Sequence, residues 1–196
     1  MSTDLNRIVD GIRACQLCAP DMSEAPQPVV QVSSTARILI AGQAPGNLAR
    51  ETGRPFTDPS GVRLRDWLQM DEATFYDPAV VAIVPMGFCF PGYDKNGGDI
   101  PPMKRCAQTW HEDLLQQLKQ VELKILIGNY AQRWHLGGDA EKTLTETVRN
   151  WRRFLDQGVI VAPHPSWRNN AWLKRNPWFE AELLPELRKR VQALRS

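Results

Sequence analysis

The sequence predicts an α/β protein in which helices cover both faces of a parallel, four-stranded β-sheet. Three observations carry this prediction. Four short apolar segments recur along the chain, and stretches with helical periodicity separate them. Two of the apolar segments run directly into turns that contain polar residues. Apolar strands that alternate with helices form a parallel sheet buried on both faces, and the chemistry of such sheets lies at the carboxyl ends of the strands.

Length and composition fit a single globular domain, which we expect to span residues 1–196. Hydrophobic residues make up 42% of the chain and charged residues 23%, which excludes a disordered protein. No apolar run approaches the roughly 20 residues that a membrane helix needs, and the N-terminus lacks a signal-peptide core. We therefore expect a cytoplasmic monomer without a membrane partner.

The first half of the chain supplies two strands and two helices. Residues 4–14 are predicted to form a helix that ends at Cys15, and segment 37–42 (RILIAG) is the first strand. A second helix is expected from Ser60, as its N-cap, to Met70. Its apolar positions are Val62, Leu64, Trp67 and Leu68. Segment 80–84 (VVAIV) is the second strand.

The second half continues the alternation. Segment 123–128 (LKILIG) is the third strand and meets a short helix, NYAQRWHL. A capped helix is expected from Thr143 to about Phe154, before the fourth strand at 159–163 (VIVAP). The tail is predicted to be helical, with a bend or break at Pro177 and Pro185.

Charge and tryptophan are concentrated in the C-terminal region, although the net charge is only +2. Residues 149–195 hold ten basic and four acidic residues, and four of the seven tryptophans lie in the same stretch. Arginine interleaved with aromatic residues suits phosphate contact and base stacking. A solvated helical face with core tryptophans explains the composition equally well.

The turn after the first predicted strand carries the first candidate site. Gly42 and Gly46 of GQAPG (42–46) allow the backbone to approach a ligand closely. The continuation GRPFTDPSG (53–61) adds Phe56 and Asp58, and a flat ring beside an acid can stack a base and position a water. The alternatives are that Phe56 plugs the core and that Asp58 caps a helix.

The second candidate site, HPSWRNN (164–170), follows the fourth predicted strand. His164 is the first polar side chain beyond that strand and is well placed to donate a hydrogen bond to a developing anion. It could instead satisfy a nearby carbonyl. Trp167 and Arg168 follow in a turn, where they could wedge into a nucleic-acid stack and touch phosphate. Trp167 could equally be a core residue.

The four cysteines suggest a metal centre. Cys15 and Cys18 form a Cys-x2-Cys pair, and Cys89 and Cys106 flank sixteen residues of a Pro/Gly-rich segment, 85–106, that has no helix or strand pattern. A loop of that length inside a compact domain needs an anchor or a function, and two thiolate ligands would anchor it. From the residues alone, structural zinc is favoured over an iron–sulfur cluster or four unrelated buried thiols.

The motifs in this order resemble those of the uracil-DNA glycosylase superfamily. A GQAPG-type turn follows the first strand, GRPF comes about ten residues later, and HPS follows the last strand. The agreement runs from Cys15 to the final helix. The cysteine pattern is similar to that of the iron–sulfur branch, often called families four and five. The resemblance implies a three-layer α/β/α fold and a 4Fe-4S cluster bound by Cys15, Cys18, Cys89 and Cys106, with zinc as the alternative and no soluble cofactor.

The resemblance also implies a DNA-repair activity. Members flip a damaged base out of DNA and hydrolyse its N-glycosidic bond. By position, the base-binding residues are Gln43, Ala44, Phe56 and Pro85, and the DNA-binding residues are Ser166, Trp167 and Arg168. His164 would stabilise the negative charge that gathers on the leaving base.

Three positions depart from the superfamily's patterns. Ala44 stands where one family has an acid, and Gln43 stands where another has a glutamate. We therefore expect Asp58 to be the catalytic carboxylate, with Asn47 as the alternative residue for positioning water. Pro85 replaces the asparagine that reads uracil in many members.

Because Pro85 stands in place of this asparagine, the sequence does not determine which base is excised. Selectivity would have to come from Asn96, Asp58 or the backbone of residues 86–88, and hypoxanthine fits as well as uracil. The alternatives to a glycosylase are a DNA-binding protein without cleavage activity and an enzyme for a small nucleobase or nucleotide.

Overall fold

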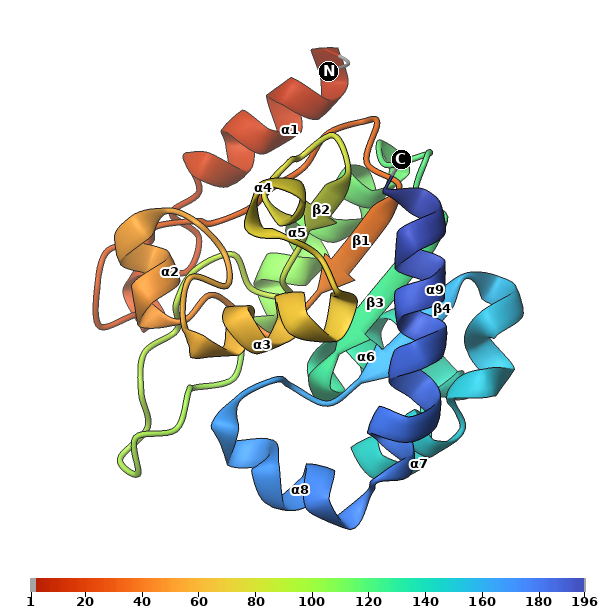
Figure 1. Cartoon of the computed structure of the whole chain (residues 1–196). Coiled ribbons are helices and arrows are strands. Elements are labelled where there is room, and N and C mark those ends of the chain that lie inside the picture. The colour runs from red at the N-terminus through yellow and green to blue at the C-terminus, as the bar shows by residue number, and fades with distance from the viewer. Residues whose placement is uncertain (1–2, 196) are drawn as a thin grey trace.

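Four parallel strands form the centre of the computed structural model, which describes residues 3–195 (Figure 1). They are β1 (Ile38–Ala41), β2 (Val81–Ile83), β3 (Leu123–Ile127) and β4 (Val159–Ala162), in the spatial order β2-β1-β3-β4. Ile38 pairs with Val81 on one side and with Leu123 on the other. The predicted four-stranded parallel sheet is confirmed, and the four strands fall within the four predicted segments.

Helices cover both faces of the sheet, because successive side chains of each strand point to opposite sides. Ile38 and Ile40 of β1 belong to the larger core, which includes residues of α3 (Pro59–Leu68) and α9 (Leu184–Leu194). Leu39 belongs to the smaller core, with residues of α1 (Thr3–Arg13) and α5 (Lys104–Gln116). Figure 1 shows α3 and α9 in front of the strands. The three-layer α/β/α prediction is therefore correct.

The other helices are short. They are α2 (Asn47–Thr52), α4 (Glu72–Phe75), α6 (Gly128–Leu136), α7 (Leu144–Arg149) and α8 (Asn170–Arg175). Helix α6 follows β3 without a loop, so the end of β3 carries no motif of its own. Within residues 3–195, no helix combines the length and apolarity needed to cross a bilayer.

The prediction for the start of α3 was wrong by two residues. Its N-cap is Asp58, and Ser60 lies inside the helix, where its hydroxyl donates to Asp58 Oδ1 at 2.7 Å. Val62, predicted to be a core position, is 60% exposed, whereas Leu64 and Leu68 are buried. The apolar stripe of α3 is therefore narrower than the sequence suggested.

The single helix predicted from Thr143 to Phe154 is also wrong. Thr143 does cap α7 in a capping box with Glu146, but α7 ends at Arg149 and a 3₁₀ segment, Trp151–Gln157, follows. In a 3₁₀ helix, side chains three residues apart are aligned. This geometry sends both Trp151 and Phe154 into the core, where they are 3% and 1% exposed.

The tail is interrupted before Pro177, as predicted, whereas at Pro185 the helix continues and only changes from π-helical to α-helical. Helix α8 ends before Pro177, and a π-helical turn, Phe179–Leu183, leads into α9, where Pro185 occupies the first turn. A proline is tolerated there because the N–H groups of a helix's first turn have no partner inside the helix.

Candidate functional site

A pocket at the carboxyl ends of β1, β2 and β4 brings the two strand-end motifs together. This inner pocket has a volume of about 70 Å³. It is lined by residues 42–46, Ala49, Pro55, Phe56, Asp58, Ser60, Ile83, Pro85, Asp99 and His164. In open parallel sheets, ligands bind at this edge, where the strand order reverses.

The inner pocket opens onto a wider groove of about 750 Å³. The outer groove and the inner pocket share the residues of the neck between them, which are residues 43–46, Asp58, Ser60, Asp99 and His164. Asp58, Asp99 and His164 are the ionisable side chains of this neck. Its other walls include Asn47, Leu48, Arg63, Tyr93 and residues 165–169. The inner pocket suits one small ring, whereas the groove has room for a longer polar ligand.

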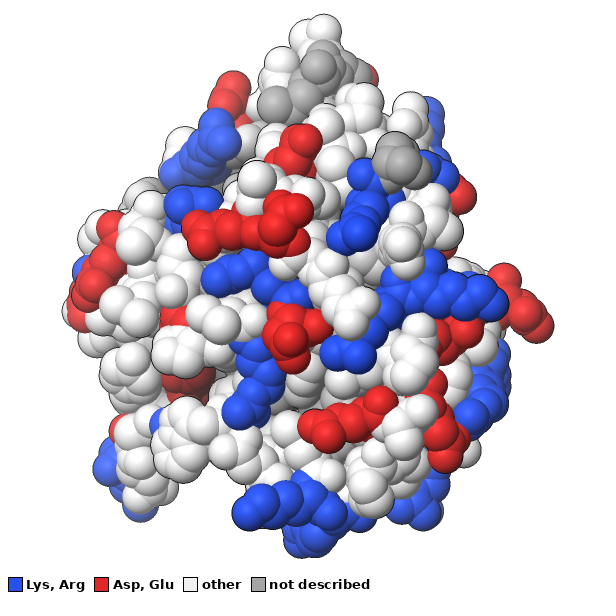
Figure 2. Space-filling model, viewed as in Figure 1, with Lys and Arg blue, Asp and Glu red and all other residues white. Residues whose placement is uncertain are grey.

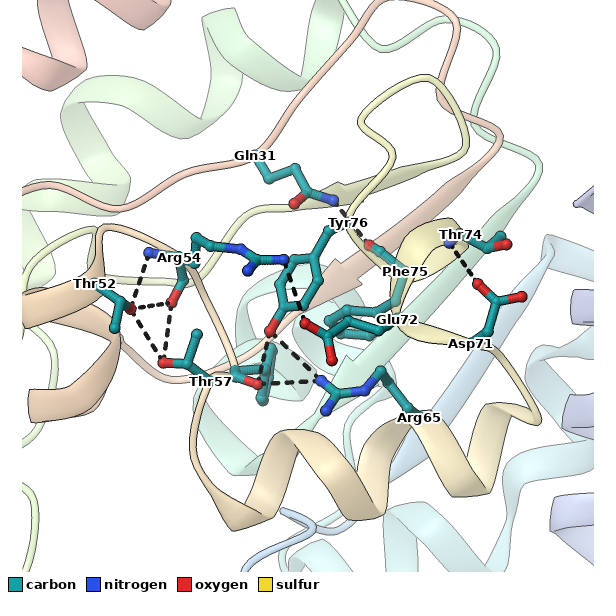
Figure 3. A network of polar contacts seen from close by, with 11 residues as sticks. Gln31, Thr52, Arg54, Thr57, Arg65, Asp71, Glu72, Thr74, Phe75 and Tyr76 are labelled. Atoms are coloured by element: carbon teal, nitrogen blue, oxygen red, sulfur yellow. Dashed lines mark hydrogen bonds and ion pairs between the residues drawn. The ribbon is translucent and has the colours of Figure 1, made fainter.

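Phe56 is held in an unusual backbone conformation beside the pocket. Its φ is +54°, in the left-handed region that non-glycine residues rarely adopt. The hydroxyl of Tyr76 donates to the Phe56 carbonyl at 3.0 Å, and Arg65 Nη1 lies at 3.5 Å from the same oxygen. Figure 3 shows Tyr76 and Arg65 pointing toward one another in this network. The guanidinium of Arg54 lies over the Tyr76 ring at 3.8 Å.

This network fixes the Phe56 ring next to His164. The two ring centroids are 6.4 Å apart at an interplanar angle of 28°. On its other side, Phe56 makes an edge contact with the buried Phe75, with ring centroids 6.3 Å apart. Both rings line the inner pocket, where Phe56 offers an aromatic surface on which a planar ligand can stack.

His164 is a neutral hydrogen-bond donor in this site. The backbone N–H of Ser166 donates to His164 Nδ1 at 3.2 Å, so the proton of the neutral ring lies on Nε2. Burial lowers the pKa of His164, although the charges of Asp58 and Asp99 act in the opposite direction. The Nε2–H group can therefore donate to an oxygen that becomes negative, without a charged imidazole.

Pro85 forms part of the inner pocket wall and is held by the helix behind it. His111 on α5 is fully buried, and its Nε2 lies 3.1 Å from the Pro85 carbonyl. Burial lowers the pKa of His111 to about 4, so the ring is neutral and donates to this carbonyl. The N–H groups of Met86 and Gly87 donate to the carbonyls of Gly42 and Gln43.

These bonds test the expectation that the backbone of residues 86–88 could read a base. Phe88 donates its N–H to Cys106 Sγ at 3.3 Å, so all three N–H groups of residues 86–88 are engaged within the protein. The structure does not offer these groups to a base. Asn96 is exposed near the tip of the long loop and does not line either pocket as described above.

Three other predicted site residues use their side chains within the protein. Gln43 Nε2 donates to the Ile100 carbonyl at 3.3 Å, and Arg168 Nη2 donates to the Gly97 carbonyl at 2.7 Å. Asn47 donates to Glu51 on the surface of α2 and lines only the outer groove. Ala44 lines both pockets.

Trp167 is the exposed tryptophan of the C-terminal region. It is 72% exposed on the wall of the outer groove, whereas Trp151 is buried. Trp172 and Trp178 pack against the larger core and donate their N–H groups to Thr145 and Asn176. Three of these four tryptophans therefore lie in the core or pack against it, as the alternative explanation of the composition expected. Trp167 is the one of the four that projects from the surface.

Many basic residues of the same region are also used internally. The pairs include Arg152 with Glu182, Arg153 with Asp139 and Glu141, and Arg190 with Glu186. Figure 2 shows acidic and basic side chains mixed over this face, with basic ones gathered at the end formed by α8. Helix α8 carries Lys174 and Arg175 in its last turn, directly after the turn that holds Trp167.

The four cysteines line a second pocket, on the side of α1 and α5. All four are free thiols, and the other walls of this thiol pocket include Ile12, Leu17, Phe88 and Trp110. Burial raises the pKa of Cys89 to about 11 and that of Cys106 to about 12. Arg105 donates to the Leu17 carbonyl and pairs with Asp21, which ties the Cys-x2-Cys turn to α5. In residues 3–195 no three His, Cys, Asp or Glu side chains lie together closely enough to hold a single ion.

Sequence reasoning missed several lining residues, such as Arg63 on the wall of the outer groove, and two that come from the long loop. Asp99 lies at the neck between the pockets, and Tyr93 is 56% exposed on the wall of the outer groove. Both belong to the long loop, whose path no local pattern in the sequence reveals.

A family model described as the uracil DNA glycosylase superfamily matches residues 29–188 of this chain. The match includes both strand-end motifs, the long loop and Asp99. Cys15 and Cys18 lie before its first residue.

Proposed function

The chain belongs to the uracil-DNA glycosylase superfamily, and from this premise we propose that it excises a deaminated base, uracil or hypoxanthine, from DNA. The observation that carries the proposal is the inner pocket, where Phe56, Asp58 and His164 meet at the carboxyl edge of the sheet. A glycosylase needs such a pocket because the N-glycosidic bond cannot be attacked while the base is stacked in the duplex.

Each of these residues has a role in the proposed reaction. The flipped base lies against the ring of Phe56, and its oxygen accepts a hydrogen bond from His164 Nε2–H. The bond between C1′ and the base nitrogen breaks, and its electron pair stays on the base. A water oxygen bonds to C1′, and Asp58 takes the water proton through the oxygen that does not accept from Ser60.

The outer groove provides the proposed DNA-binding surface. Trp167 would fill the space that the flipped base leaves in the duplex, because an exposed aromatic side chain can insert between base steps. Ser166 and Arg168 lie beside it on the same wall, and Lys174 and Arg175 of α8 would contact phosphates. Arg168 would keep the bond from Nη2 to the Gly97 carbonyl and contact phosphate through its other N–H groups.

A cleavage assay tests this function. Single- and double-stranded oligonucleotides carrying uracil, hypoxanthine or xanthine are incubated with purified protein and then treated with alkali. We expect strand scission at one lesion, and the lesion that is cleaved identifies the base that a pocket with Pro85 accepts. Asp58→Asn is the matched inactive control and is expected to lose about 10²-fold or more in rate.

Binding without scission at any lesion would contradict the glycosylase proposal. It would favour a DNA-binding protein that has lost cleavage with the substitutions at Ala44 and Pro85. Variants that remove the charges of Lys174 and Arg175 test the proposed phosphate contacts. If these variants cleave DNA as fast as the wild type does, the contacts are contradicted.

We also propose that the thiol pocket holds a metal centre, a 4Fe-4S cluster or, as the alternative, zinc. The kind of donor fits, because four free thiols line one largely apolar pocket, and a single zinc ion would in addition require these thiols to move closer together. Backbone N–H groups donate to two of the sulfurs, from Gln27 to Cys89 and from Phe88 to Cys106. Such bonds stabilise thiolate ligands in iron–sulfur sites. With four thiolate ligands the centre has a structural role, joining α1 to the long loop.

Changing Cys89→Ser is expected to remove this centre. The anaerobically purified wild-type protein should be brown, absorb at about 400 nm and contain iron and sulfide, and the variant should lose all three. Met22→Leu alters another residue of the same pocket and serves as the control. A colourless wild-type protein with one zinc would select the alternative, and a metal-free wild-type protein would contradict the proposal.

A further inference from the structure

Asp99 is the second carboxylate at the neck between the inner pocket and the outer groove. It lines both, as Asp58 and His164 do. A flipped nucleotide passes through this neck with its base in the inner pocket and its phosphates in the groove, so the neck surrounds the sugar. Asp99 reaches this place from the long loop, far in sequence from both strand-end motifs.

The loop that carries Asp99 is fastened on both sides of it. Arg168, from the turn after β4, donates to the carbonyl of Gly97 at 2.7 Å. Gln43, from the turn after β1, donates to the carbonyl of Ile100 at 3.3 Å. The two strand-end motifs therefore hold the residues that flank Asp99 and set its position between them.

The loop is also ordered from within. Tyr93 and Asp99 form an antiparallel bridge, and Asp94 Oδ1 accepts the N–H groups of Asn96 and Gly98 at 2.8 and 2.9 Å. The left-handed Gly97, with φ +74°, allows the chain to turn back at the tip. Asp99 is thus presented by a structured turn at a defined place in the site.

The charge of Asp99 is directed at the site. Its carboxylate and that of Asp58 both act on His164, where each opposes the fall in pKa that burial causes. Arg63 and Arg168 are the cationic residues of the outer groove, and their side chains bond to carbonyl or amide oxygens rather than to Asp99. Neither of these cations is thus occupied in neutralising Asp99, whose negative charge can act on a positive charge that develops in the neck.

We propose that Asp99 is a further catalytic carboxylate, which contacts the sugar and stabilises the positive charge that develops at C1′. The inference rests on the proposed glycosylase function. As the bond from C1′ to the base breaks, its electron pair leaves with the base and the sugar becomes cationic. Asp99 stabilises this cation by proximity, and water then adds to C1′ while Asp58 takes the water proton. A carboxylate fixed where charge develops lowers the barrier because it needs no reorganisation during the reaction.

The test compares Asp99→Asn with Asp99→Glu, which restores the charge, and with Asp113→Asn, which removes a charge from the exposed surface of α5. Two measurements are made on each variant. The first is the single-turnover rate of base release. The second is the affinity for two duplexes, one with a cationic abasic analogue that has a protonated nitrogen at the anomeric position and one with a neutral tetrahydrofuran analogue.

We expect Asp99→Asn to lower the rate by about 10²-fold and to weaken binding of the cationic analogue by about tenfold or more, with little change for the neutral one. Asp99→Glu should recover part of both losses, and Asp113→Asn should behave like the wild type. Equal losses for both analogues would overturn the proposal in favour of a structural role for the loop, and no loss for either would overturn it outright. If the wild type releases no base, the function proposed above fails, but the ratio of the two affinities still tests Asp99.

Discussion

The variant His164→Ala is expected to release base at least about 10²-fold more slowly than the wild type in single-turnover assays. The imidazole supplies the only side-chain N–H that we assign to the charge on the leaving base. Alanine removes this donor without adding bulk, so DNA affinity, measured with the neutral abasic analogue, should change little. Wild-type rates from this variant would contradict the assigned role of His164, though not the fold.

The pH dependence of the rate separates a neutral from a charged donor. Burial lowers the pKa of His164 and Ser166 donates to Nδ1, so the ring is neutral near pH 7 and gains a proton only as the pH falls. We therefore expect no loss of rate attributable to His164 between about pH 7 and pH 9. A charged donor would instead lose activity as the pH rises above its pKa, so a flat rate over this range indicates a neutral donor and a falling rate a charged one.

Replacing Gly61 by alanine is expected to damage both stability and activity. A Cβ at Gly61 would lie 1.8 Å from the Phe56 carbonyl oxygen, so the backbone of Phe56 would have to move. This is the oxygen that Tyr76 and Arg65 hold. We expect a loss of about 2–3 kcal/mol in the free energy of unfolding, together with a large loss of base release as Phe56 leaves its place beside His164.

Two further variants make the Gly61 prediction specific. At Gly138 a Cβ meets nothing within 4 Å, so Gly138→Ala should leave stability and activity close to wild type. Tyr76→Phe removes the hydroxyl that donates to Phe56 and should cost about 1 kcal/mol of stability, with a smaller loss of activity than Gly61→Ala. Chemical denaturation measures stability, and full activity in folded Gly61→Ala would show that Phe56 has no fixed role.

The sequence predicted the sheet and the two strand-end motifs because both depend on local patterns. Short apolar segments mark the strands, and a parallel sheet places the turns that follow β1 and β4 at the same edge. Helix α5 escaped prediction because one of its buried positions is a histidine, His111, which interrupts the apolar spacing of Ala107 and Leu114. The position of Asp99 depends on two hydrogen bonds between residues that are far apart in the sequence. Arg168 donates to the carbonyl of Gly97, 71 positions away, and Gln43 donates to the carbonyl of Ile100, 57 positions away. No short-range pattern can encode such contacts.

The segment between Cys89 and Cys106 begins and ends in the thiol pocket and passes the neck of the inner pocket on the way. A single insertion or deletion in this segment would therefore change the reach of Asp99 and the approach of the thiols at the same time. We therefore expect that this segment can be exchanged between related proteins only as a whole. Both cysteines, and the residues Gln43 and Arg168 that hydrogen-bond to its carbonyls, would have to be transferred with it.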